Sequence, residues 1–260
     1  MTTVREPAVA GQFYPEDAGE LQALVNRMLG EVQDREDVAP KAIVAPHAGY
    51  AYSGAVAASA YAHLSRYRDV YTRVVLLGPC HRVPVAGMAL SAADAFRTPL
   101  GDVPVDRESV AALEEQGIAV FEPSHQYEHS LEVHLPFLQT VLGEFSIVPL
   151  VVGEATPQAV ARLLETLWGG PETLIVVSSD LSHYLDYDTA RAQDRETCRR
   201  IEHLDTRIDH DDACGATPLR GLLLAAKRRG MRVKTHDLRN SGDTGGDRDF
   251  VVGYGAWLFA

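Results

Sequence analysis

The chain of 260 residues is 46% hydrophobic and 23% charged, the balance of a globular protein, which excludes disordered, collagen-like and coiled-coil classes. Its 24 Lys and Arg against 36 Asp and Glu leave a formal charge of -12, so we expect no nucleic-acid partner, and an anionic ligand would need locally placed cations. The N-terminus lacks the pattern of a secretory signal, and no segment approaches the ~18 apolar residues of a membrane span. Three scattered cysteines fit a reducing compartment, so the sequence predicts a cytoplasmic protein without a membrane partner.

Short runs rich in Val, Ile and Leu alternate with segments of helical period, which predicts a single α/β domain over residues 1–260, with a mixed central β-sheet flanked by helices. Ser53 is the expected N-cap of the second helix, and the charged stretch from Glu31 to Lys41 is an expected solvated connector. The apolar last eleven residues, FVVGYGAWLFA, are expected to complete the sheet. Strands are expected at 42–45, 74–77, 147–152, 174–177, 233–238 and 250–259. Helices are expected at 18–32, 53–64, 109–115, 131–142, 157–167, 189–204 and 218–229.

Three of these strands end in turns that carry histidines or carboxylates. The first strand is followed by His47 in AIVAPHAGYAYSG, and the second by His81 in VVLLGPCHRVP. The third is followed by Ser179, Asp180 and His183 in LIVVSSDLSHY. In open α/β sheets ligands bind beyond the carboxyl ends of the strands, so we expect these three turns to face one site. A single histidine after a strand is more often an ordinary loop residue, and the expectation depends on all three together.

The densest cluster is HQYEHSLEVHLPFL, which does not match the H-E-x-x-H arrangement of zinc proteases. We predict that His129 faces the site as an acid/base group, and that Glu128, Glu132 and His134 orient it. Because His134 lies among apolar residues, a structural core histidine is an equally good interpretation there. His125 is expected to support this cluster.

The last loop, LRNSGDTGGDRDFVVGY, holds Asp243 and Thr244 among glycines before the final strand, where an ordinary turn is the plainer interpretation. Neither a phosphate-binding loop nor a dinucleotide fingerprint occurs, so no nucleotide cofactor is expected. The sequence assigns no chemical partner to Cys214. The remaining residues without an assigned role are Cys80, Cys198, His63, His203, His210 and His236.

The ordered motifs APHAGYAYSG, LLGPCH, EHSLEVHLPFL, VVSSDLSHY and NSGDTGGD resemble the Memo family, including the prokaryotic members called AmmeMemoRadiSam system protein B. AGQFYP and FRTPLG also look like that family. The resemblance covers nearly the whole chain, and it implies a fold similar to the class III extradiol ring-cleaving dioxygenases, in which a non-haem ferrous ion opens a catechol ring.

Carried over position by position, the resemblance implies metal-ligating histidines at His47, His81 and His183. It implies an acid/base histidine at His129, to which we ascribe a pKa near neutrality. The third ligand is open between His183, Asp180 and Asp243. Asp180 and Glu132 join His129 as expected catalytic residues. The further expected pocket residues are Glu128, His134, Ser179, Asp243 and Thr244.

The chain departs from the family's animal members at Thr244, where they have a cysteine close to the metal. Imidazoles with a carboxylate or hydroxyl favour Fe(II), Mn(II) or Zn(II), whereas a thiolate favours soft ions such as Cu(I). The expected cofactor is therefore a divalent metal ion, with Fe(II) favoured, Zn(II) and Mn(II) next, and Cu less favoured.

Three functions compete. The first is a mononuclear oxygenase of the extradiol type that acts on a small catechol-like compound. The second is a non-catalytic metal- or peptide-binding adaptor that works with a radical S-adenosylmethionine protein and an AMMECR-type partner. The third is a metal-dependent hydrolase, because Zn(II) with an open position generates hydroxide near neutral pH.

Overall fold

The computed structural model describes residues 2–33 and 38–260, so part of the expected connector, residues 34–37, lies outside the described residues. The strands are β1 (Val4–Arg5), β2 (Ala42–Ala45), β3 (Arg73–Pro79), β4 (Met88–Leu90), β5 (Ala95–Thr98), β6 (Gly101–Pro104), β7 (Ala119–Val120), β8 (Ser146–Val152), β9 (Thr173–Ser178), β10 (His183–Leu185), β11 (Val233–Asn240) and β12 (Val251–Phe259). The helices are α1 (Ala18–Glu31), α2 (Ala55–Tyr61), α3 (Arg107–Glu115), α4 (Pro123–Gln126), α5 (Leu135–Val141), α6 (Pro157–Leu167), α7 (Tyr187–Glu202), α8 (Ala216–Arg228) and α9 (Ser241–Thr244).

A large mixed sheet forms the centre of the molecule, in the order β10-β12-β2-β9-β3-β8-β4-β7, and β11 also pairs with β12. Strands β2, β9, β3 and β8 are parallel neighbours, whereas β12 and β4 run antiparallel to this group. The four parallel strands are nearly all buried, and this explains why they read in the sequence as continuous apolar runs. The predicted α/β fold with a mixed sheet is confirmed.

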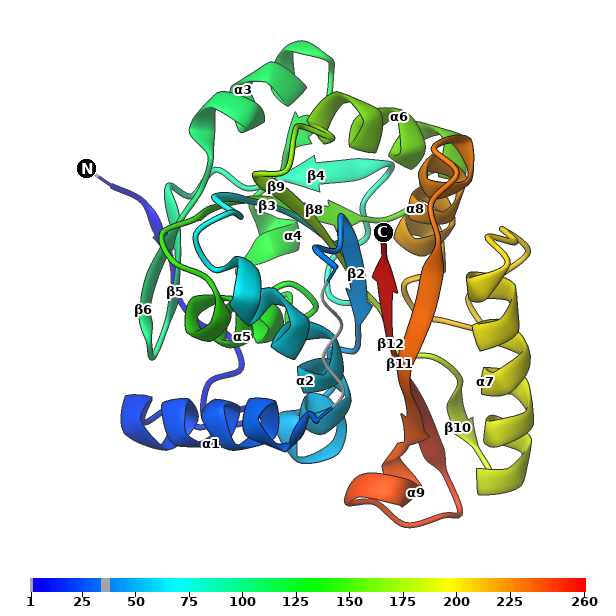
Figure 1. The fold of residues 1–260 in the computed structure, drawn as a ribbon. Coiled ribbons are helices and arrows are strands. Elements are labelled where there is room, and N and C mark those ends of the chain that lie inside the picture. Colours follow the sequence, from blue (N-terminus) through cyan, green and yellow to red (C-terminus); the bar gives the residue numbers. More distant parts are fainter. Residues whose placement is uncertain (1, 34–37) are drawn as a thin grey trace.

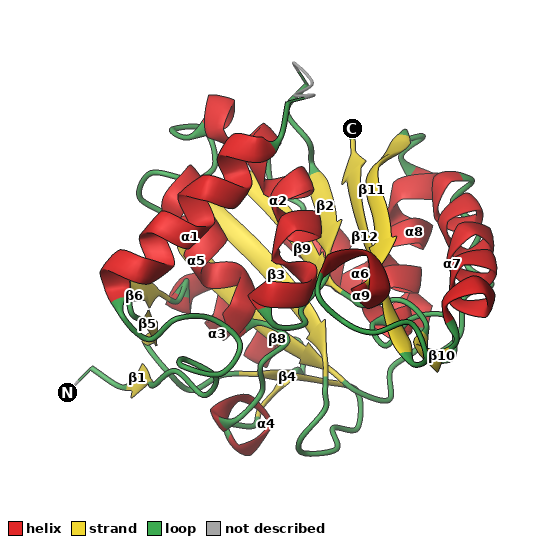
Figure 2. Ribbon diagram, turned by 90° about the horizontal axis from the view of Figure 1, so that it is seen from below, coloured by secondary structure: helices red, strands yellow, loops and turns green. Residues whose placement is uncertain are grey.

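Helices cover both faces of this sheet (Figures 1 and 2). Helix α2 packs on β2 and β12 and contacts α1 and α5, whereas α8 packs on β3 and β9 and contacts α6. Helix α7 lies against β11 and β12. Within the described part of the chain, no helix is long and apolar enough to cross a bilayer.

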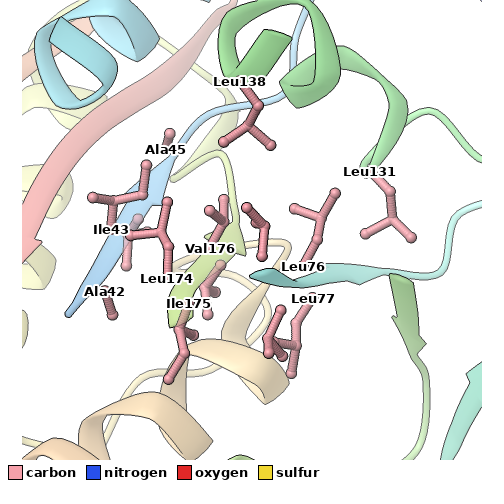
Figure 3. Packing of buried hydrophobic residues seen from close by; sticks show 14 of the residues in the cluster. Ala42, Ile43, Ala45, Leu76, Leu77, Leu131, Leu138, Leu174, Ile175 and Val176 are labelled. Carbon is pink, nitrogen blue, oxygen red and sulfur yellow. The ribbon is translucent and has the colours of Figure 1, made fainter. Parts of the chain in front are cut away.

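The core is built from side chains that meet across the parallel strands. Ile43 of β2 is in register with Val176 of β9, and Val176 is in register with Leu76 of β3, so the three side chains lie side by side (Figure 3). All three are fully buried. Leu138 of α5 packs in the same cluster, which fixes the parallel strands against the helical layer that carries the 128–134 segment.

The C-terminal segment completes the sheet, as its composition predicts. β12 pairs with β2 through Trp257, Leu258 and Phe259, and its other neighbours are β10 and β11. Trp257 and Phe259 are fully buried. The last strand is thus an interior strand of the sheet.

Two local predictions were wrong. Ser53 does not cap a helix, because it lies inside a π-helical turn, Tyr50–Gly54, where its hydroxyl donates to the Ala48 carbonyl. The helix expected from 131 to 142 is divided into a 3-10 turn, Glu132–His134, and α5. Six short strands were not predicted, because such short runs carry no periodicity: β1, β4, β5, β6, β7 and β10. The equally short β2 was predicted from its apolar run.

Candidate metal centre

The carboxyl ends of β2, β3 and β9 meet at one edge of the sheet. Because the three strands are parallel neighbours, the turns that follow them emerge on the same side. The ring centroids of His47 and His81 are 5.1 Å apart, and the His129 ring lies 5.5 Å from His47 and 4.6 Å from His81. The structure therefore brings together three histidines that the sequence analysis selected.

His47 is held in one tautomer by a chain of hydrogen bonds. The Ser178 hydroxyl donates to the Ser130 carbonyl at 2.7 Å, so its proton is already used. The contact of 2.6 Å between this hydroxyl and Nδ1 of His47 must therefore be donated by the histidine. Burial, followed by the neighbouring histidines, lowers the pKa of His47 well below its usual value. The ring is neutral, with its lone pair on Nε2.

His81 has the same tautomer for a different reason. Its Nδ1 lies 2.9 Å from Oε1 of Glu128, and its backbone N–H donates to Oε2 of the same carboxylate. Burial raises the pKa of Glu128, but the hydrogen bonds that it accepts from the His81 ring and from the backbone amides of His81 and Ser130 outweigh burial and lower that pKa to about 2. The ionised carboxylate can only accept, so Nδ1 of His81 donates, and Nε2 is the ring nitrogen left to bind a metal when the ring is neutral. A carboxylate behind a histidine is the usual support of a metal-ligating imidazole.

Cys214 is the functional candidate that the sequence analysis missed. Its Sγ lies 3.3 Å from Nε2 of His47 and accepts the backbone N–H of Asp180 at 3.3 Å. Burial, followed by the Asp180 carboxylate, raises the pKa of the thiol far above its usual value. The thiol is thus protonated in the metal-free protein, and a bound cation would be needed to make it a thiolate.

Two glycines allow the segments that carry the site residues to pack closely against one another. A Cβ on Gly78 would lie 2.6 Å from the Ser130 hydroxyl, so only glycine lets β3 approach the segment that carries His129. A Cβ on Gly215 would lie 2.7 Å from Cβ of Ser179, and the Gly215 amide donates to the Ser179 hydroxyl. Ser179 is therefore a buried anchor for the turn that carries Cys214. The pair Cys214-Gly215 was the signal available in the sequence.

The donor atoms form two groups within the described part of the chain. In the first, one ligand atom each of His47, His81 and Cys214 lie within 4.8 Å of one another, and the second contains His81, Glu128 and His129. Neither group includes Asp180, His183 or Asp243, which the sequence left open as third ligands. Two imidazoles and a thiol are donors that Zn(II), Fe(II) and Cu accept, so the residues fit a transition-metal ion.

His129 lies beside this donor set. Its side chain is 13% exposed, and its buried Nδ1 is 3.5 Å from Oε1 of Glu128 without a hydrogen-bond partner in the described residues. Burial lowers the pKa of His129 to about 4, below the near-neutral value expected from the sequence. The ring is therefore neutral at pH 7, and Glu128 is positioned to pair with it when it gains a proton.

Asp180 and His183 border the site from the third turn. Oδ1 of Asp180 accepts the His47 backbone N–H at 2.8 Å, and its Oδ2 lies 3.8 Å from Nε2 of His47. Burial raises the pKa of this carboxyl. Nδ1 of His183 donates to the Leu181 carbonyl, so Nε2 is the ring nitrogen left for another partner.

Two residues expected to orient His129 are bonded elsewhere. Glu132 is fully buried and accepts from Arg5, from Tyr14 and from two backbone amides of the N-terminal segment. His134 is buried, and its Nδ1 pairs with the Tyr61 hydroxyl at 2.8 Å. These bonds give both side chains a structural role. His125 is also structural, because its Nε2 donates to the Ala89 carbonyl.

Asp243 and Thr244 lie in α9, outside the histidine cluster. Asp243 accepts from the Tyr187 hydroxyl and from the Asn240 backbone N–H, and so caps its own helix. The Thr244 hydroxyl donates to the Ser241 carbonyl. Neither side chain lines the cavity on which the histidines open.

That cavity has a volume of about 670 Å³, in the range of small-molecule sites. Its wall contains His47, His81, His129, Asp180 and His183, together with Tyr184, Leu185, Gln193, His210, Asp211 and Cys214. His210, which the sequence left without a role, thus belongs to the site. The donor set faces a space large enough for a small substrate.

Comparisons with known proteins agree with the motifs. A family model described as Memo-like protein matches residues 5–258. A MEMO1 family protein of Aquifex aeolicus is 38% identical and covers 98% of this chain and 99% of its own, and one of Methanosarcina barkeri is 39% identical and covers 97% and 98%. A solved structure of an uncharacterized protein from Escherichia coli K12 shares the fold, with a TM-score of 0.54, 11% identity and coverage of 84% of this chain and 98% of its own. The chain therefore belongs to the Memo-like family.

Proposed function

We propose that this Memo-like protein is a mononuclear metalloenzyme that acts on a small molecule in the histidine-lined cavity. The observation that carries the proposal is the convergence of ligand atoms of His47, His81 and Cys214 within 4.8 Å of one another, with Nδ1 of both histidines hydrogen-bonded and Nε2 left for a metal. We favour Fe(II) and an oxygenase reaction of the extradiol type on a catechol-like compound, as the family resemblance implies. The Cys214 thiol, which the sequence analysis did not place at the site, also suits soft ions such as Cu(I).

The chain's own residues have distinct parts in such a reaction. His47, His81 and Cys214 would hold the ion, which would supply a Lewis-acidic centre with open positions toward the cavity. Ser178 and Glu128 fix the tautomers of the two histidines. Neutral His129 would accept a proton from a substrate hydroxyl, and the Glu128 carboxylate would stabilise the resulting imidazolium.

A metal-dependent hydrolase is the second candidate, and Cys214 is the observation that favours it. Cysteine and histidine are both ligands of catalytic Zn(II), which takes three protein ligands and keeps a fourth position open. The same His129 would then take a proton from the attacking water. The two reactions are distinguished by the identity of the bound metal and by whether the reaction requires O₂.

The test starts with protein purified without oxygen and analysed for bound metals. We expect about one equivalent of a transition metal, with affinity reduced at least ~100-fold in His47→Ala and His81→Ala and ~10-fold or more in Cys214→Ser. Cys198→Ser is the matched control, because Cys198 is a buried thiol that contacts Thr235, far from the donor set. Oxygen uptake with catechols by the Fe(II) form supports the oxygenase. Wild-type protein that binds no metal, or variants that bind it equally well, would refute the proposal.

A further inference from the structure

A second cavity lies next to the histidine-lined cavity, and His81 belongs to the walls of both. It has a volume of about 770 Å³ and shares three wall residues with the first cavity: His81, His210 and Cys214. A molecule bound at the donor atoms could therefore extend in either direction. We call the second cavity the arginine arm, after Arg82 and Arg220 in its wall.

The two cavities differ in charge. The first contains the carboxylates of Asp180 and Asp211 and no Lys or Arg. The arginine arm contains Arg82 and Arg220, and its one carboxylate is the exposed Glu154. The described residues include no ion pair or side-chain hydrogen bond to either arginine. The Arg82 charge reaches the site, since it helps to lower the pKa of His129.

Arg220 is the less ordinary of the two arginines. It lies on α8 and is partly buried, and its Nε is shielded from solvent without a hydrogen-bond partner in the described residues. Because solvent does not reach this N–H, an anion in the cavity would bind the other guanidinium nitrogens, for which the described residues also supply no acceptor. Arginine is also the residue best shaped to bind carboxylate or phosphate.

The helices around the arginine arm add to its positive potential. Thr156 in its wall is the N-cap of α6, and Thr217 is in the first turn of α8, so two helix N-termini border the cavity. Helix N-termini favour negative groups. The arm is a local cationic site in a chain whose net charge is -12.

We propose that the substrate carries a carboxylate or phosphate group that Arg220, assisted by Arg82, binds in the arginine arm. This inference rests on the proposed metalloenzyme function for the other end of the substrate, which lies at His47, His81 and Cys214. The substrate class is therefore an anionic small molecule, and its charged group and its reacting group occupy different cavities.

The experiment measures binding of three probes, benzoate, phenyl phosphate and the neutral isostere benzamide, by titration calorimetry. Metal-free protein is used first, so that direct ligation of a metal by the anion contributes nothing. We expect the wild type to bind at least one anionic probe ~10-fold or more tightly than benzamide. Arg220→Gln should abolish this preference and leave benzamide binding unchanged, and Arg82→Gln should reduce it less.

Arg232→Gln is the matched control, because Arg232 is exposed and its side chain likewise has no bonded partner in the described residues. It should keep the anion preference. If Arg220→Gln loses the preference over benzamide for only one of the two anions, the proposal is supported. That anion then identifies the charged group of the substrate as phosphate or carboxylate. Equal binding of all three probes by the wild type, or a preference that survives Arg220→Gln, overturns it.

Metal analysis of the same preparations separates this proposal from the metal site. One bound metal together with no Arg220-dependent preference overturns the arginine arm and leaves the metal centre intact. An Arg220-dependent preference in a protein that binds no metal supports the anion site and refutes the metalloenzyme.

Discussion

The exchange Glu132→Gln tests whether this carboxylate stabilises the fold or serves the reaction. Glu132 is fully buried and forms a salt bridge with Arg5, whose side chain is also buried, and it accepts the backbone amides of Ala8 and Val9. A neutral amide at this position leaves the guanidinium buried without its counter-charge. Breaking a buried pair from one side typically costs about 3–5 kcal/mol.

The expected loss is therefore about 3–5 kcal/mol in the free energy of unfolding, a large share of the ~5–15 kcal/mol of an ordinary protein. Urea unfolding followed by circular dichroism measures it, at a temperature where the variant is folded. Glu122→Gln is the matched control, because Glu122 accepts from Ser91 and Ala92 and forms no ion pair with an arginine among the described residues. Its loss should stay below about 1 kcal/mol.

The reasoning also fixes what Glu132→Gln leaves unchanged. The Glu132 carboxylate is bonded to the N-terminal segment and belongs to neither donor group, so metal affinity measured on the folded variant should equal that of the wild type. A variant of normal stability that has lost activity or metal would refute the structural role and restore the catalytic one expected from the sequence.

Three further outcomes are expected. Glu128→Gln should reduce metal affinity about 10–100-fold, because the amide no longer fixes the His81 tautomer, and equal affinity would show that this support is unimportant. Burial raises the pKa of Asp194 to about 6 from an unfolded value of about 3.9, so the ionised form opposes folding. Asp194→Asn should therefore stabilise the protein by about 2–3 kcal/mol at pH 7, a gain that disappears near pH 4; a gain independent of pH contradicts the cause. A chain ending at Asp249 should not fold, because it lacks β12, and cooperative melting of that chain would disprove this.

Much of the site could be predicted because the ends of the buried strands can be recognised in the sequence. The apolar runs of β2, β3 and β9 are long enough to recognise, and parallel pairing places the turns after them at one edge. His47 and His81 were found in this way. His129 was found from the density of histidines around it.

The parts that could not be predicted depend on contacts between distant segments. Cys214 reaches His47 because Gly215 packs on Ser179, a close approach that has no local pattern. Glu132 was assigned to the reaction because its sequence neighbours are histidines, but its partners lie in the N-terminal segment. Glu132 has a structural role because it is buried against the N-terminal segment. That contact between distant parts of the chain exists only in the folded protein.

The donor set also joins two residues that are far apart in the sequence. His47 and Cys214 are 167 residues apart in the chain, and they meet only when the whole sheet is assembled. An ion bound between them would stabilise the native state alone, by RT ln(1 + [M]/Kd), where [M] is the free metal concentration and Kd its dissociation constant. The melting temperature of the protein should thus rise with metal concentration, and a chelator would lower the resistance of the entire fold to proteolysis.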